Sequence, residues 1–222
     1  MPHAALSSPE SSETSQRDKA YQLLRGQIIL QQLPEGERLR EPIWAQRLGV
    51  NRMALREAFA RLEAEGLIER GPKTGYFVPR LGDEDFREIL EIRSALESLA
   101  IGRIIAQKRN TRRRLEPLRQ AIDQLQQLID DGYQLGASEA DRRFHEQLIA
   151  LGGNRRLAMI YERAPLPMIH GFLFNTPRWE PEMRNTLKQH RLILAAILNG
   201  DVQAAQRAIR EHLSDRYLPQ AL

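Results

Sequence analysis

The sequence contains no cysteine. A disulfide framework, a thiolate zinc site, an iron–sulfur cluster and a cysteine nucleophile are therefore all excluded. No apolar run comes near the roughly 20 residues that a membrane-spanning helix needs. The first 16 residues have neither the basic start nor the apolar stretch of a signal peptide. These absences predict a soluble, cytoplasmic protein with no membrane partner.

Lysine is scarce, since only four of the 33 basic residues are lysine and the other 29 are arginine. This excess of arginine raises the isoelectric point to about 9.7, although the net charge is only +4. Up to residue 80 there are 12 basic and 10 acidic residues, and beyond it 21 and 19, so each part carries only +2. Bulk charge therefore does not indicate a nucleic-acid partner, and local patterns must decide.

A change of pattern near residue 80 divides the chain into parts. Residues 1–15 are rich in Ser, Pro and Glu, and we expect a disordered tail there. Residues 16–80 predict three helices followed by two short strands joined as a hairpin, which is the order of a winged helix-turn-helix. Residues 81–222 show helical periodicity throughout and predict a bundle of six or seven helices. The expected fold class is therefore mostly α, with a winged domain followed by an all-helical domain.

The third helix of the first domain is predicted to begin after Asn51, a good N-cap residue, and to stop at Gly66. One face of this helix is apolar, and the opposite face carries Met53, Arg56 and Ala60, with Arg52 at its flank. An arginine on a free helix face can pair with guanine or with phosphate in the major groove. The surrounding segment adds to this charge, with six arginines against two glutamates between residues 38 and 61, Arg40 among them.

Three runs in this region, LPEGERLRE, LGVNRMALREAFARLEAEGLIER and GYFV, resemble the DNA-binding domain of the GntR family of bacterial transcription regulators. The resemblance covers about residues 18–78. It implies double-stranded operator DNA as a partner. It also implies DNA contacts from a set of positions in the third helix and at the hairpin tip: Asn51, Arg52, Met53, Arg56, Lys73, Thr74 and Gly75. Met53-Ala54 and Pro42 depart from the residues that many members carry there.

Histidine is rare in the second domain, and three of its histidines lie on inward helix faces. Asp141 and His145 are four residues apart, so both project from one face of a helix. His190 lies ten residues before Gly200, and His212 lies eleven residues after Asp201. At a rise of about 1.5 Å per residue, each histidine is roughly 15–16 Å from the turn between the two helices. In an antiparallel helical hairpin these two histidines stand side by side. One carboxylate and three imidazoles could thus bind a divalent metal, whereas His170 has no partner and is expected to be structural.

The pattern D-x-x-F-H-x-x-L, then GGN, then H-x-x-I-x-x-A-I-x-x-G-D and a final histidine resembles the FCD effector domain of the FadR-type branch. The resemblance covers about residues 83–218. It implies a metal held by Asp141, His145, His190 and His212, for which zinc is the first expectation and nickel or manganese are alternatives. It also implies a small carboxylate effector. A homodimer would place two recognition helices on a two-fold operator, and we expect a repressor.

Arg93 matches a family arginine that faces the effector pocket, where it could clamp a carboxylate. Alternatively, Arg93 is an exposed partner of Glu97, four residues further along the helix. Two rival functions also stay open. One is a metalloenzyme that uses the Asp/His cluster, although Glu146 is off the ligand face and no Ser/His/Asp set or phosphate-binding loop is present. The other is an acyl-CoA-responsive regulator without metal.

Overall fold

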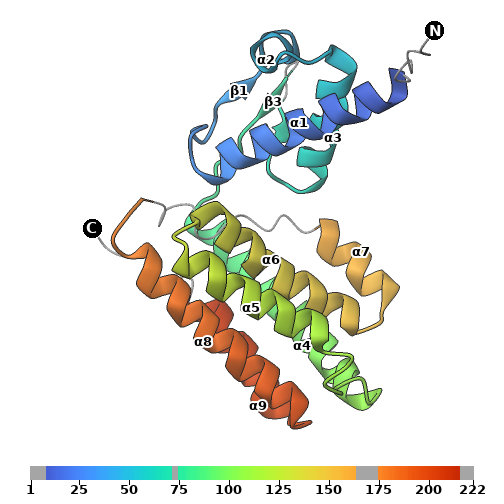
Figure 1. Cartoon of the computed structure of the whole chain (residues 1–222), viewed down its shortest axis with the longest axis vertical. Coiled ribbons are helices and arrows are strands. Elements are labelled where there is room, and N and C mark those ends of the chain that lie inside the picture. The colour runs from blue at the N-terminus through green and yellow to red at the C-terminus, as the bar shows by residue number, and fades with distance from the viewer. Residues whose placement is uncertain (1–8, 72–74, 164–174, 216–222) are drawn as a thin grey trace, which may run out of the picture. The chain divides into compact units, whose positions relative to one another are not determined.

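The computed structural model describes residues 9–71, 75–163 and 175–215 (Figure 1). The chain forms two compact units, residues 1–80 and 81–222. None of the helices in the described ranges is long and apolar enough to cross a membrane.

The first unit is a winged helix-turn-helix, as the sequence predicts. Its helices are α1 (Pro9–Ile29), α2 (Glu41–Leu48) and α3 (Arg52–Ala64), and its strands are β1 (Arg38–Leu39), β2 (Glu69–Arg70) and β3 (Tyr76–Phe77). The predicted hairpin is β2–β3, and β1, just before α2, is a third strand that the sequence did not predict. β3 lies in the middle and pairs antiparallel with both neighbours, so that its residue Tyr76 faces Leu39 on one side and Arg70 on the other.

The core of this unit lies between α1, α3 and the sheet. Phe59 of α3 is fully buried, and its ring centre lies 4.9 Å from that of Tyr76. Glu65, just after α3, accepts hydrogen bonds from Tyr21 Oη at 2.6 Å and from Arg25 Nε at 3.0 Å, both on α1. These contacts hold α3 by one face and leave its other face free.

α1 begins at Pro9, so residues 9–15 are helical where a disordered tail was expected. The expectation used apolar periodicity, which is absent before Arg17. A helix can nevertheless begin without apolar periodicity, because proline at the first helical position and acidic residues in the first turn favour a helix start. Residues 1–8 lie outside the described ranges.

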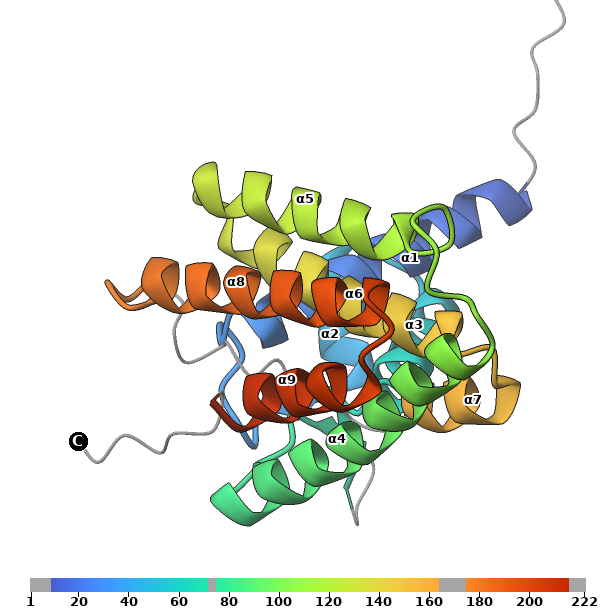
Figure 2. The ribbon, with the colours of Figure 1, turned by 90° about the horizontal axis from the view of Figure 1, so that it is seen from below.

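The described part of the second unit consists of helices, in agreement with the prediction of a helical bundle. They are α4 (Asp83–Ala106), α5 (Glu116–Asp130), α6 (Gln134–Leu151), α7 (Arg155–Arg163), α8 (Trp179–Leu198) and α9 (Val202–Asp215). Helices α4, α9, α8, α5 and α6 each pack against the next, and α6 returns to α4 to close the circuit (Figure 2). α7 packs against α4 and α6. The side chains that point into this circuit form the interior in which the predicted cluster lies.

Helical spacing in the sequence predicts helices over 111–131, 138–150 and 155–174, the last with a proline break, and the observed bounds differ. α5 begins at Glu116, next to Pro117, which favours the first turn of a helix, and α6 begins at Gln134. α7 is described from Arg155 to Arg163. His170 lies outside the described residues.

Candidate functional site

The free face of α3 carries the side chains that the sequence places there. Arg52, Met53 and Arg56 are exposed, and the exposed fraction of Met53 reaches 61%. The opposite face is buried, as the helical wheel predicts, and consists of Ala54, Leu55, Ala58, Phe59 and Leu62. α3 therefore presents two arginines and a methionine to a partner while its apolar face is used inside the unit.

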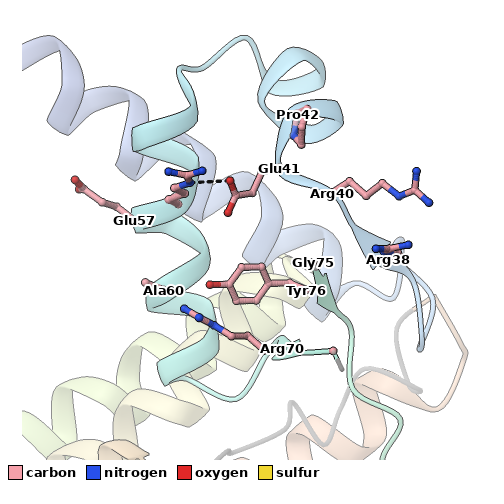
Figure 3. A pocket seen from close by; sticks show the side chains of 11 residues that line it. Arg38, Arg40, Glu41, Pro42, Glu57, Ala60, Arg70, Gly75 and Tyr76 are labelled. Atoms are coloured by element: carbon pink, nitrogen blue, oxygen red, sulfur yellow. Dashed lines mark hydrogen bonds and ion pairs between the residues drawn. The ribbon is translucent and has the colours of Figure 1, made fainter. Parts of the chain in front are cut away.

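A groove of about 1130 Å³ lies beside this face, between α3, the start of α2 and the three-stranded sheet (Figure 3). Four arginines line it: Arg38, Arg40, Arg56 and Arg70. Arg38 and Arg40 lie across the groove from α3 (Figure 3). Arg56 does not extend freely, because its Nε donates to Glu41 Oε2 at 2.7 Å. The groove thus presents guanidinium groups from both walls, which suits a phosphate backbone.

The other predicted DNA positions lie close to this surface or outside the described residues. Asn51 caps α3, since its side-chain oxygen accepts a hydrogen bond from Ala54 N at 2.7 Å. The capping bond uses the side-chain oxygen, and the side-chain NH₂ group is the donor that Asn51 could offer to a partner. Gly75 lines the groove and has φ +125°, which a residue with Cβ rarely adopts. Lys73 and Thr74 lie outside the described residues.

In the second unit, Asp141, His145, His190 and His212 come together in the interior. Each offers a ligand atom, and these four atoms lie within 4.8 Å of one another. His212 Nε2 lies 3.2 Å from His145 Nε2 and 3.3 Å from His190 Nε2. Asp141 Oδ1 lies 3.3 Å from His190 Nε2 and 3.7 Å from His145 Nε2. The predicted convergence is therefore present: one aspartate and one histidine come from α6, and one histidine each from α8 and α9.

Helical periodicity explains why these polar residues are buried. Asp141 and His145 lie on the same stripe of α6 as Phe144 and Leu148, which are fully buried. The three histidines are fully buried, and Asp141 is 5% exposed. Phe144 also stacks on the ring of His190, with the ring centres 3.8 Å apart and the planes 14° from parallel. This stacking fixes the plane of the His190 imidazole.

The Nδ1 atoms of two rings face oxygen atoms. His145 Nδ1 lies 2.6 Å from Glu97 Oε2, and His212 Nδ1 lies 2.7 Å from Gln189 Oε1. Both oxygens accept hydrogen bonds, so each Nδ1 donates and each Nε2 is directed toward the cluster. The two Nε2 atoms lie 3.2 Å apart. Two nitrogen atoms held at about 2.0–2.1 Å by one tetrahedral zinc would be about 3.3 Å apart, so this separation fits a shared metal ion.

Glu97 of α4 is fully buried behind His145. Its Oε1 accepts hydrogen bonds from Arg93 Nε and from Tyr161 Oη, both at 3.0 Å, while Oε2 faces His145. Burial would raise the pKa of Glu97, but His145, Arg93 and the hydrogen bonds lower it to about 2. Burial raises the pKa of Tyr161 well above its usual value, so its hydroxyl keeps the proton that it donates. Glu97 is therefore an ionised carboxylate inside the bundle.

The pair between Arg93 and Glu97 forms, but the expectation that such a pair would be exposed is wrong. Arg93 is 5% exposed and Glu97 is fully buried, because both lie on the side of α4 that faces α6 and α7. Sequence reasoning missed the link from Glu97 to His145, and it also missed Tyr161 and Gln189. Glu97 lies seven residues after Leu90 and seven before Ile104, and this spacing could have suggested that its side chain points into the bundle. Its partner His145 is 48 residues away on α6, so helical spacing alone could not have identified the contact.

No acid in the described residues is placed over the cluster as a catalytic base would be. Glu146 forms an ion pair with Arg142, one helical turn earlier, and Glu211 is exposed. Glu97 is near, but it is engaged by three donors. The described surroundings of the cluster thus provide ligands without a free general base for hydrolysis.

Comparisons with known families match both units. The model of the bacterial regulatory proteins of the gntR family matches residues 16–78, and that of the FCD domain matches residues 88–215. A helix-turn-helix transcriptional regulator from the TAR-I ttuE–ttuC′ intergenic region of Agrobacterium vitis is 31% identical over 150 residues, which span 67% of this chain and 88% of that protein. The transcriptional repressor RspR of Escherichia coli is 28% identical over 202 residues, 88% of this chain and 84% of that protein.

Solved structures show the same fold. The structure of E. coli McbR/YncC covers 90% of this chain and 94% of its own, with a TM-score of 0.72 and 22% sequence identity. The relatives are regulators of transcription and not enzymes, which sets the metalloenzyme reading aside.

Proposed function

The chain belongs to the gntR family of bacterial regulatory proteins and carries an FCD domain, and from this premise we propose that it is a metal-containing repressor controlled by a small carboxylate. The observation that carries the ligand-responsive part is the convergence of Asp141, His145, His190 and His212 in the interior of the second unit. Operator DNA would be the partner of the first unit, which places the protein in the cytoplasm.

The DNA-reading surface consists of the free face of α3 and the adjoining groove. Arg52, Met53 and Arg56 would meet base edges, and Asn51 would donate through its amide nitrogen. Arg40, Gly75 and the hairpin-tip residues Lys73 and Thr74 would contact the backbone or the neighbouring groove. The exposure of the three α3 side chains supports this assignment, as does the lining of the groove by four arginines.

The metal would be held by the three Nε2 atoms and by the carboxylate of Asp141. Zinc suits this donor set and the separations of 3.2–3.3 Å between imidazole nitrogens. Nickel and manganese accept the same ligands and favour more than four of them. The bound ion would supply a positive charge that attracts an effector carboxylate. The acyl-CoA alternative has no use for the quartet, so the ligand set favours the metal-containing regulator.

Arg93 would bind the effector carboxylate. Its guanidinium already pairs with Glu97 at 3.0 Å in the interior. An effector would therefore share or take over an existing ion pair rather than meet a free arginine. Arg93→Lys keeps the charge but loses the fork geometry that a carboxylate prefers. We expect this variant to bind the effector more weakly and to retain DNA binding without effector.

A homodimer would present two copies of α3 to a two-fold operator. In support, Ile92 and Leu99, seven residues apart on one side of α4, are 49% and 50% exposed, and Ile160 on the adjacent α7 is 55% exposed. Leu99→Asp should shift the protein toward monomer in analytical ultracentrifugation. Leu192→Asp, on α8 and 55% exposed in the wild type, is the matched control.

The test of the whole proposal begins with selection of duplexes from a random library by the full chain. A two-fold symmetric site should emerge. A panel of small mono-, di- and tricarboxylates is then screened for compounds that release this site from the metal-loaded protein. The duplex must change the affinity of the protein for the compound by a certain factor. The compound must then change the affinity of the protein for the duplex by the same factor. A chain that selects no duplex, or whose duplex binding ignores every carboxylate, would contradict the proposal.

A further inference from the structure

His145 belongs to two buried clusters at once. Through Nε2 it faces the other ligand atoms on α6, α8 and α9. Through Nδ1 it is held at 2.6 Å by Glu97 of α4. Glu97 in turn accepts from Arg93 on its own helix and from Tyr161 on α7. Both the carboxylate and the imidazole are fully buried, so no solvent competes for this hydrogen bond.

α4 contributes no ligand to the quartet, yet it is the first helix of the second unit. It begins at Asp83, three residues after the first unit ends at Arg80. Any change that the effector site imposes on the DNA-reading unit through the chain must therefore pass into α4. From α4, the side chain of Glu97 contacts His145, a predicted metal ligand, at 2.6 Å.

We propose that Glu97 is a positioning residue that couples metal occupancy of the quartet to α4. This inference rests on the metal site of the proposed function. The Glu97 carboxylate holds the proton of His145 on Nδ1 and so directs the Nε2 lone pair toward the ion. A bound cation withdraws charge from the ring and strengthens the bond from its N–H to the carboxylate. α4 is therefore held more firmly to α6 when the metal is bound.

The coupling runs in both directions. A group that displaces Glu97, or that draws Arg93 away from it, alters the orientation and basicity of His145 and with them the metal affinity. The carboxylate is thus a point at which an anion bound to Arg93 and a cation bound to His145 act on the same side chain.

Gln189 provides a contrast within the same site. It holds His212 Nδ1 at 2.7 Å, as Glu97 holds His145, but it lies on α8, next to the ligand His190. Removing this acceptor disturbs the predicted ligand His212 and leaves the hydrogen bond between Glu97 and His145 in place. Glu97 and Gln189 therefore each hold the Nδ1 atom of one predicted ligand, Glu97 from α4 and Gln189 from α8.

The experiment compares full-length wild type, Glu97→Gln, Glu97→Asp and Gln189→Met. Zinc is titrated against a chromophoric chelator to obtain the affinity. Hydrogen exchange of peptides from α4 is then measured without metal and at saturating zinc. In the zinc-bound proteins, NMR of the imidazoles reports the hydrogen bond of the Nδ1 proton. Glu97→Asp retains the charge beside Arg93 while shortening the reach to His145, and it serves if Glu97→Gln fails to fold.

Both Glu97 variants and Gln189→Met should lose about 10–100-fold in zinc affinity. Zinc should increase protection of α4 in wild type and in Gln189→Met, but much less in the Glu97 variants. The NMR signal of the His145 Nδ1 proton should move upfield in Glu97→Gln. Wild-type affinity and wild-type protection of α4 in a folded Glu97 variant would overturn the coupling. Absence of zinc uptake by the wild type would instead overturn the metal site itself, and all four titrations would then coincide.

Discussion

Replacing His212 by leucine should cost more stability with a divalent metal than without one. The imidazole is fully buried, with Nε2 3.2 Å from His145 Nε2 and Nδ1 2.7 Å from Gln189 Oε1. Leucine has a similar volume but no hydrogen-bonding atom, so it removes these contacts. The loss of a partner by a buried polar group costs about 1–3 kcal/mol. In the presence of a chelator, His212→Leu should therefore be less stable than the wild type by about this amount.

With metal the difference should grow. An ion that binds only the native state stabilises it by about 2.7 kcal/mol when its free concentration is 100 times the dissociation constant. For a chain of this size that corresponds to a rise of about 5–11 °C in Tm. His212→Leu has lost one of four ligands and should gain much less at the same zinc concentration.

Differential scanning calorimetry in a chelator and at a buffered zinc concentration measures both effects. Ser138→Ala is the control, since Ser138 is 2% exposed, lies one turn before Asp141 on α6, and its hydroxyl has no hydrogen-bond partner in the described structure. This variant should keep the full zinc-dependent rise. The reasoning is refuted if zinc leaves the wild-type Tm unchanged, or if His212→Leu is destabilised by the same amount in chelator and in zinc.

Three further predictions concern the first unit. Arg52→Ala should weaken operator binding by about 1–3 kcal/mol if the side chain pairs with a base, and should weaken binding to all duplexes equally if it contacts phosphate. Fluorescence anisotropy measures both affinities. Unchanged affinity of the Arg52→Ala/Arg56→Ala double variant would remove the recognition-helix assignment. Glu41→Gln removes a negative charge beside the groove, where the carboxylate pairs with Arg56 at 2.7 Å. The affinity of this variant for any duplex should therefore rise and depend more steeply on salt. Weaker binding by the variant would mean that Glu41 instead orients Arg56 for DNA. Burial and the hydrogen bond to Glu65 raise the pKa of Tyr21 to about 12 from 10.0. Above pH 10 the unfolded chain loses this proton while the folded chain keeps it, so the stability that Tyr21 adds relative to Tyr21→Phe should shrink between pH 8 and pH 11. Urea unfolding of both proteins measures this difference, and a constant difference would argue against the shift.

Local sequence determined those features that depend on the helical repeat and on the residues at helix ends. Asn51 and Gly66 mark the limits of α3, and the spacing of its apolar residues sets which face is left for DNA. The four-residue step from Asp141 to His145 places both on one face. The equal distances of His190 and His212 from their turn bring them together in a hairpin. Each inference needs only one helix, or two joined by a short turn.

Only the tertiary structure decided which faces meet across the bundle. Helical periodicity tells that Glu97 shares a side of α4 with Arg93, but the rotation of α4 against α6 and α7 determines that this side is buried and that Glu97 meets His145. The same holds for β1, whose two residues become a strand only because β3 offers them hydrogen bonds. Contacts between segments far apart in the chain depend on how the whole core packs, and no local pattern encodes that packing.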